Sequence, residues 1–259
     1  MRYRVRAHNT ATASTNKIHD DDVARGLGFR GGLVPGVDVY AYLCHLPAER
    51  WGRDWVERGS MAARFASPVY DGDEVDITAT ADGDGALDLV LTDPAGTECA
   101  RSRAVLPAEP AAPPPIDDWP AGDPPEAAPV ATPEILTSRP FGRLEVHFRA
   151  DRCNEYLDDV REQLPLFRTE RVAHPGWLLR FANYVLTANV RLGPWIHVES
   201  SVRFFGTVTD GDLVETRARV TGVYERKGHQ FVDLDVLQLA GDRPVVRSAH
   251  TAIYRPRGT

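Results

Sequence analysis

The sequence has no long apolar run, few cysteines and no excess of basic residues, and each shortage excludes a class of protein. No stretch approaches the roughly 18 apolar residues of a membrane-spanning helix. The 259 residues include 30 basic and 37 acidic side chains, a net charge of −7, which disfavours a general nucleic-acid binder because such proteins need a basic face. The three cysteines, Cys44, Cys99 and Cys153, make neither a disulfide framework nor a metal-ligand pair. The polar N-terminus lacks the pattern of a signal or transit peptide. We therefore expect a cytoplasmic protein with no membrane, nucleic-acid or metal partner.

Proline is concentrated in the middle of the chain. Half of the 20 prolines fall between residues 107 and 133. Proline donates no backbone hydrogen bond and fixes φ, so this segment can form neither a central strand nor a long helix. We interpret residues 107–138 as an extended linker between an N-terminal domain, 1–106, and a C-terminal domain, 139–259.

The two halves resemble each other in three blocks that occur in the same order. "ARFASPVYDGDEVDITATADG" from Ala63 matches "VRFFGTVTDGDLVETRARVTG" from Val202. Upstream, "LVPGVDVYAYL" matches "AHPGWLLRFANYVL", and "STNKIHDDDV" matches "RCNEYLDDV". This order at a nearly constant offset predicts an internal duplication.

Each half is expected to contain a short strand, a polar loop, an apolar helix opened by Pro-Gly, and several long strands. The helices are expected near residues 37–46 and 177–190, and they are apolar on most sides, which is typical of buried helices. The following strands alternate with period two. A long antiparallel sheet wrapped round one apolar helix is the hot-dog architecture. The predicted fold is therefore an α+β double hot-dog, in which two such sheets pair as a pseudo-dimer within one chain.

A loop motif in the first half resembles that of a known enzyme family. "NKIHDDDVARGLGF", followed by "LVPGV", resembles the hydratase motif of the MaoC-like family, the (R)-specific enoyl-CoA hydratases and related dehydratases. In that family, a carboxylate and an imidazole add or remove water across the double bond of an acyl thioester. The resemblance implies that His19 transfers protons, that Asn16 positions the loop, and that the N–H of Gly36 polarises the thioester carbonyl.

The motif departs from the family at its acid. Two residues before the motif asparagine the family has its catalytic aspartate, and this chain has Ser14. We keep Ser14 as a candidate catalytic residue beside His19. In the second half Leu157 occupies the place of His19, but His174 precedes the Pro-Gly helix start. We predict that His174 could meet His19 across the groove between the halves.

Four residues are candidates for substrate binding: Gly36 and Gly176 at the two helix starts, Tyr40 on the first helix, and Arg30, which could meet a phosphate of the carrier. A core position for Tyr40 and a solvated position for Arg30 are the alternatives. The aspartates 20–22 are interpreted as caps of a short helix rather than as metal ligands.

The predicted function is a hydratase or dehydratase of fatty acid or polyketide metabolism, acting on an acyl thioester with Ser14 in place of the usual aspartate. No separate cofactor is expected, since CoA or phosphopantetheine is part of the substrate. An acyl carrier protein is an alternative carrier, and a homodimer is left open. The competing hypotheses are a hot-dog thioesterase, a lyase or cyclase acting on a polyketide-like substrate, and a non-catalytic acyl-binding subunit.

Overall fold

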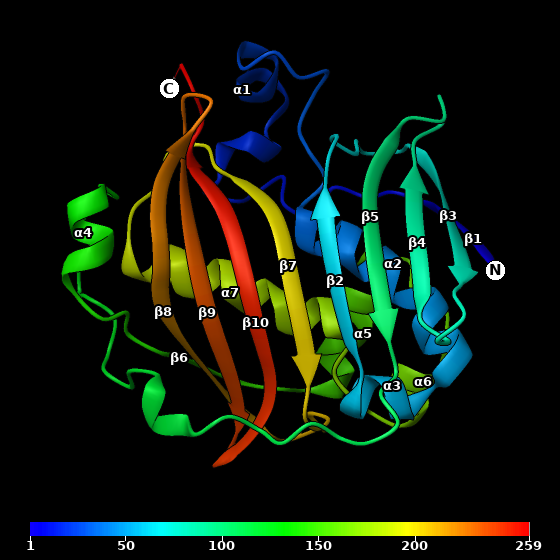
Figure 1. The fold of residues 1–259 in the computed structure, drawn as a ribbon. Coiled ribbons are helices and arrows are strands. Elements are labelled where there is room, and N and C mark those ends of the chain that lie inside the picture. Colours follow the sequence, from blue (N-terminus) through cyan, green and yellow to red (C-terminus); the bar gives the residue numbers. More distant parts are fainter. Residues whose placement is uncertain (259) are drawn as a thin grey trace.

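The chain folds around one continuous antiparallel sheet of ten strands. The computed structural model describes residues 1–258, with the strand order β1-β3-β4-β5-β2-β7-β10-β9-β8-β6 (Figure 1). The strands are β1 Arg2–Arg6, β2 Ser60–Phe65, β3 Glu74–Ala81, β4 Leu87–Thr92, β5 Glu98–Val105, β6 Leu144–His147, β7 Ile196–Phe204, β8 Leu213–Arg226, β9 His229–Ala240 and β10 Arg243–Arg255.

The sheet consists of two half-sheets with the same internal order. From the outer edge inward, the first half runs β1-β3-β4-β5-β2 and the second runs β6-β8-β9-β10-β7. The halves join where β2 pairs with β7, from Ser60 opposite Arg203 to Arg64 opposite Glu199. This seam covers one edge of each half-sheet, which otherwise would present unpaired backbone groups to solvent. The side-by-side pairing predicted from the repeat is therefore present.

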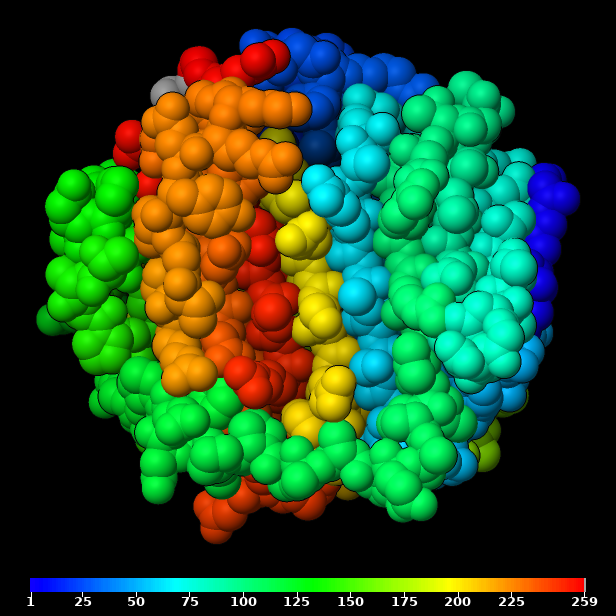
Figure 2. Space-filling view, in the orientation of Figure 1, coloured from blue at the N-terminus to red at the C-terminus, as the bar shows by residue number. Residues whose placement is uncertain are grey.

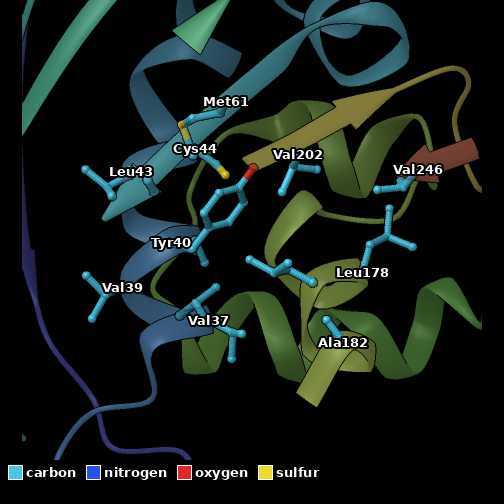
Figure 3. Close-up of a cluster of buried hydrophobic side chains, with 14 of the residues drawn as sticks. Val37, Val39, Tyr40, Leu43, Cys44, Met61, Leu178, Ala182, Val202 and Val246 are labelled. Carbon is cyan, nitrogen blue, oxygen red and sulfur yellow. The ribbon is translucent and has the colours of Figure 1, made fainter. Parts of the chain in front are cut away.

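Each half-sheet wraps one long apolar helix. The helices are α2, Gly36–Trp51, and α7, Pro175–Asn189, and both lie behind the sheet in Figure 1. Their buried side chains meet those of the seam strands in one core, to which Tyr40, Leu178 and Val202 contribute (Figure 3). The remaining helical segments are η1 Lys17–His19, α1 Asp21–Gly26, α3 Arg53–Arg58, η2 Ile116–Asp118, α4 Pro133–Ser138, α5 Ala150–Asp159 and α6 Pro165–Thr169. No helix among residues 1–258 is long and apolar enough to cross a membrane.

A buried ion pair joins the two central helices. Asp38, in the first turn of α2, accepts hydrogen bonds from Nε and Nη2 of Arg180 on α7, at 3.1 and 2.8 Å. Thr10 donates a third hydrogen bond to Asp38, at 2.6 Å. Asp38 is completely buried, so its charge depends on these partners for stabilisation.

The proline-rich segment crosses the outer face of the sheet and is fixed there by one tryptophan. Figure 2 shows it along the lower edge of that face. Trp119 is buried against Leu237 and Leu239 of β9, and its Nε1 donates to the carbonyl oxygen of Asp235 at 2.9 Å. The guanidinium of Arg219 lies 4.7 Å from the centre of its ring. The segment therefore packs on the sheet as well as connecting the halves.

Candidate functional site

His19 ends a short helical turn, where one of its ring nitrogens is fixed by the backbone. Asn16 caps the turn, and its side chain accepts from the N–H of Ile18 at 3.3 Å. The Nδ1 of His19 lies 2.7 Å from the carbonyl oxygen of Leu33. A carbonyl only accepts hydrogen bonds, so Nδ1 carries the proton. In a neutral ring, Nε2 is then the basic nitrogen.

Asn16 holds the other side of the ring. Its Oδ1 accepts from the N–H of Trp195 at 3.1 Å, and its Nδ2 donates to the carbonyl oxygen of Trp195 at 3.0 Å. This pair of bonds fixes which end of the amide is nitrogen. The same Nδ2 lies 3.3 Å from Nε2 of His19, to which it can donate its second hydrogen. Both the tautomer and the orientation of His19 are therefore determined by neighbours, one of which comes from the second half of the chain.

A glycine lets the next segment lie directly against this turn. A methyl group added at Gly32 would collide with the carbonyl group of His19. The N–H of Gly32 donates to Asp21 at 2.8 Å, and the N–H of Leu33 donates to Ile18 at 3.2 Å. Asp20 caps α1 by accepting from the N–H groups of residues 22 and 23, as expected for these aspartates. The glycines of "GFRGGL" thus bring Leu33, and with it the start of α2, to His19.

An apolar cavity of about 240 Å³ opens beside His19 and the start of α2. Asn16, His19 and Gly36, three residues singled out by the sequence motif, all line it. Gly36 is the first residue of α2, so its N–H has no partner within the helix and lies at the positive end of the helix dipole. The other lining residues are Ile18, Phe29, Leu33, Val34, Pro35, Val39, Phe65, Ala66, Ser67, Pro68, Val69, Asn183, Trp195, Ile196, His197, Val198 and Ile253. No carboxylate lines this cavity among the residues that the structure describes.

Burial keeps His19 in its neutral, basic form. Removal from water lowers the pKa of His19 below its ordinary value of 6.5. The carbonyl of Leu33 and the charge of Asp38 oppose this shift without cancelling it. Near neutral pH the lining of the cavity therefore includes both a neutral imidazole and a backbone N–H at a helix start. This combination can accept a proton and stabilise negative charge on an oxygen.

A second, polar hollow of about 920 Å³ also includes His19. Its lining includes three arginines, Arg6, Arg25 and Arg30, and five aspartates at positions 20, 21, 71, 73 and 159. Arg30 lies in this hollow, where it forms an ion pair with Asp73 at 2.6 Å and packs over the ring of Tyr70. Its charge is therefore already compensated within the protein.

Two candidates from the motif lie outside both spaces. The hydroxyl of Ser14 accepts a hydrogen bond from the N–H of Asn16 at 3.1 Å, which supports the turn. Tyr40 is fully buried in the core and points toward Cys44 (Figure 3). Neither side chain lines the apolar cavity or the polar hollow.

The corresponding helix start in the second half is closed. Nδ1 of His174 accepts a hydrogen bond from the N–H of Gly176 at 3.0 Å, so the backbone donor that matches Gly36 is already used. Gly176 is also packed against the hydroxyl of Tyr156 and against Ala41. His174 lies 3.6 Å from Glu162 and lines neither space beside His19. The structure thus does not bring His174 together with His19.

Two groups of buried polar residues were not singled out from the sequence. Glu162 accepts hydrogen bonds from Nδ1 of His45 at 2.9 Å and from the N–H of Leu164 at 2.7 Å. Burial raises the pKa of Glu162, but the hydrogen bonds and charges of His174 and His45 outweigh it and hold this pKa at about 2. The second group, His197, Ser200 and His250, borders the apolar cavity through His197. Among the described residues no cluster of histidine, cysteine, aspartate and glutamate could hold a metal ion.

The comparison with solved structures agrees with this architecture over nearly the whole chain. A protein of Mycobacterium tuberculosis described as having a double hot-dog fold matches with a TM-score of 0.56, at 14% identity, covering 98% of this chain and 95% of the other. The chain has the double hot-dog fold. A MaoC-like dehydratase matches with a TM-score of 0.60, at 11% identity, covering 98% of both chains. The predicted fold class is therefore confirmed.

Hot-dog proteins of another activity are also similar in structure. An acyl-ACP thioesterase from Bacteroides thetaiotaomicron matches with a TM-score of 0.50, at 11% identity, covering 97% of both chains. No protein-family model matches the sequence, and no curated protein matches it in sequence. At these identities the structural likeness establishes the fold, and the activity has to be inferred from the site itself.

Proposed function

We propose that this chain is a hydratase or dehydratase that acts on a short acyl thioester and uses His19 as its single proton-transfer residue. The observation that carries the proposal is the fixed orientation of His19. Its Nδ1 is bonded to Leu33, which leaves Nε2 as the basic nitrogen, and the residue lines an apolar cavity that also includes the start of α2. The fold is shared with a MaoC-like dehydratase and with an acyl-ACP thioesterase, so the choice between these activities rests on His19 and its cavity.

The proposed dehydration uses one imidazole for two proton transfers. Nε2 of His19 exchanges its 3.3 Å contact with Asn16 for the substrate and removes the proton from the carbon next to the thioester carbonyl, and the electron pair moves onto the carbonyl oxygen. The N–H of Gly36 stabilises this enolate. The enolate then collapses, the bond to the 3-hydroxyl group breaks, and the imidazolium donates its proton to the leaving oxygen. Water departs and His19 returns to its neutral form, so no carboxylate is needed to balance the protons.

The sizes and charges of the two spaces support a short acyl chain on a pantetheine arm. The apolar cavity of about 240 Å³ is smaller than the roughly 300–1,000 Å³ of pockets for drug-sized ligands. The polar hollow that also borders His19 has two more aspartates than arginines, five against three. Such a lining does not attract the phosphates of CoA, whereas it can accept the uncharged amides of pantetheine. The acyl chain would lie in the cavity and the pantetheine arm in the hollow.

The test is turnover of crotonyl and 3-hydroxybutyryl thioesters of CoA and pantetheine, with enoyl absorbance and free thiol followed together. The His19→Ala variant is expected to lose about 10²- to 10⁴-fold in rate. His147→Ala is the matched control, because His147 is exposed on β6 and should leave turnover unchanged. Unchanged turnover in His19→Ala would contradict the proposal, and thiol release without a change in enoyl absorbance would identify a thioesterase.

The stereochemistry gives a second test. Because one side chain handles both protons, hydrogen and hydroxyl should be added to the same face of the double bond. Hydration of crotonyl-pantetheine in D2O should then give one diastereomer, the syn product, which NMR can identify. An anti product would require a second proton-transfer group on the opposite side of the substrate.

A further inference from the structure

A buried histidine from the second half faces the helix start that would hold the thioester carbonyl. His197 lies on β7, is only 6% exposed and lines the apolar cavity. Its Nε2 is bonded to Ser200, but its Nδ1 has no hydrogen-bond partner among the described residues. A buried polar atom without a partner is unusual in a folded protein, which makes Nδ1 a candidate for contact with a ligand.

A β-bulge turns the side chain of His197 toward the helices. In the pairing of β10 with β7, Thr251 lies opposite Glu199 and Ala252 lies opposite His197, so Val198 is left over. Side chains alternate along a strand, so His197 and Ser200 would face opposite sides of a regular β7. The additional residue turns both toward the helices, where both are buried.

Nδ1 of His197 lies close to the backbone of Gly36. A methyl group added at Gly36 would be 2.8 Å from Nδ1 and 3.1 Å from Cβ of His197. The ring therefore closes the space directly beside the helix start, and the cavity lies next to both groups. An oxygen atom that accepts from the N–H of Gly36 would have Nδ1 as a near neighbour.

The neighbours of His197 permit a proton on Nδ1, and an oxygen atom bound in the cavity would favour it. The hydroxyl of Ser200 lies between Nε2 of His197, at 2.8 Å, and Nδ1 of His250, at 2.9 Å. The hydroxyl has one hydrogen, so it donates to one ring and accepts from the other. If it donated to His250, the N–H at Nε2 of His250 would remain buried without an acceptor. If it donates to His197, the unpaired N–H lies instead at Nδ1 of His197, on the wall of the cavity, where the oxygen of a ligand can accept from it, and the lone pair at Nε2 of His250 remains unpaired. In this second arrangement Nδ1 of His197 is an N–H donor.

The charge of the ring is also suited to donation. Burial, together with the neighbouring His250, lowers the pKa of His197 well below 6.5, while the carbonyl of Glu199 opposes this shift in part. Burial lowers the pKa of His250 to about 3. Both rings are therefore neutral near pH 7, and a neutral imidazole can still polarise a carbonyl through its N–H.

We propose that the Nδ1–H of His197 is a second hydrogen-bond donor, beside the N–H of Gly36, to the carbonyl oxygen of the bound acyl thioester. Ser200 and His250 are positioning residues: with the hydroxyl of Ser200 donating to Nε2, the proton of His197 is on Nδ1, and the carbonyl oxygen supplies the acceptor that this N–H otherwise lacks. This inference rests on the proposed function and assigns a catalytic residue that the loop motif does not contain. It also suits a cavity without a carboxylate, since two donors can stabilise an enolate where no second proton-transfer group is present.

The test measures polarisation of a carbonyl that cannot be hydrated. Butyryl-pantetheine labelled with ¹³C at the carbonyl is bound to the wild type, to His197→Leu and to His197→Asn, and the carbonyl stretch is recorded by infrared difference spectroscopy. The wild type should shift the stretch to lower frequency than in water, and the leucine variant should lose most of this shift. The asparagine variant should retain it, because its amide nitrogen can lie near the position of Nδ1. Turnover of crotonyl-pantetheine should fall about 10²- to 10³-fold in the leucine variant and much less in the asparagine variant.

Equal carbonyl shifts in all three proteins would overturn the role of His197, even if turnover depended on His19. Hydrolysis of the probe, detected as free thiol, or failure of the wild type to bind it would instead overturn the proposed function, and this inference with it. Should His197→Leu fail to fold, Ser200→Ala keeps the ring and removes the hydroxyl that fixes its tautomer. The carbonyl shift should then fall partway, with a change in the ¹⁵N signals of His197, and an unchanged shift would count against the proposal.

Discussion

Replacing Arg180 with methionine is expected to destabilise the fold and to shift the pH dependence of the site. The fully buried Asp38 accepts two hydrogen bonds from Arg180 and one from Thr10. Methionine retains much of the apolar stem but removes the guanidinium. Asp38 would then be a buried charge with the hydroxyl of Thr10 as its remaining side-chain partner.

The expected cost follows from this burial. Removing one partner of a buried ion pair costs about 3–5 kcal/mol, because the other charge is left uncompensated. At about 2–4 °C per kcal/mol for a chain of roughly this size, the melting temperature should fall by about 6–20 °C. Arg101→Met is the matched control, because Arg101 is 67% exposed in its pair with Glu98, and exposed pairs contribute about 0–1 kcal/mol. The double variant Asp38→Asn/Arg180→Met should recover much of the loss.

The same substitution should also act on His19. As a base, His19 works only when neutral, so activity should fall as the pH drops through its pKa, which burial holds below 6.5. The negative charge of Asp38 raises this pKa, and loss of Arg180 would leave that charge unbalanced. The acid limb of the kcat/KM profile should therefore move to higher pH. A variant with the melting temperature and the pH profile of the wild type would refute the reasoning.

Three further predictions concern other parts of the site and the buried polar groups. Gly36→Ala should lower the free energy of unfolding by about 1–3 kcal/mol in urea titrations, because the new methyl group would press on His197; Gly83→Ala, which meets no atom within 4 Å, should not. Glu162 has a folded-state pKa of about 2 against an ordinary 4.5, which corresponds to about 3 kcal/mol of the free energy of unfolding. This contribution is complete above pH 4.5 and is lost as the pH falls toward 2. Urea titrations between pH 7 and pH 3 should show this loss in the wild type, and Glu162→Gln should be less stable at pH 7 and flatter across the range. Crotonyl-pantetheine and crotonyl-CoA should have kcat/KM values within about tenfold of each other, less than 1.4 kcal/mol apart, because the polar hollow does not favour phosphates; a much greater preference for CoA in steady-state assays would contradict this use of the hollow.

The sequence predicted the fold well because the same constraints occur twice. Pro-Gly before a run of apolar residues indicated the starts of both α2 and α7, and the observed helices, Gly36–Trp51 and Pro175–Asn189, begin there. Period-two patterns indicated the strands: of the four residues expected on one face of β8, Val214, Thr216 and Ala218 are buried and Val220 is partly buried. Such local patterns depend on burial and backbone chemistry near each residue, which is why one sequence is sufficient to recognise them.

The site was only partly predictable, because six of the 20 residues that line its cavity come from the second half of the chain. The motif pointed to Asn16, His19 and Gly36, and the structure places all three around one cavity. It gave no sign of His197, since regular alternation along β7 would have placed that side chain on the opposite face from Ser200. The bulge at Val198 depends on pairing with β10, about 50 residues later, and a strand pattern does not reveal it.

The buried contacts between the two halves could not be predicted from the sequence for a related reason. His45 and Glu162 lie 117 residues apart, and neither belongs to a motif. Glu162 follows a helical segment that aligned with the catalytic loop of the first half, where the repeat drew attention to Leu157 instead. A side chain that becomes important only through a distant partner cannot be recognised from its neighbours in sequence.

The closed helix start of α7 shows that two halves joined in one chain can differ from each other at corresponding positions. In a dimer of identical subunits every substitution appears at both helix starts, so closing one would close the other. Here a histidine already occupies the backbone donor of one copy, while the other copy keeps its donor next to a cavity. Each molecule thus has one helix start that is open to a cavity, and the second half can acquire substitutions that would close the first. Its β7 can supply a wall to its neighbour's site, and its α7 can supply the counter-ion for Asp38. The two halves therefore have the same fold but different roles around the cavity.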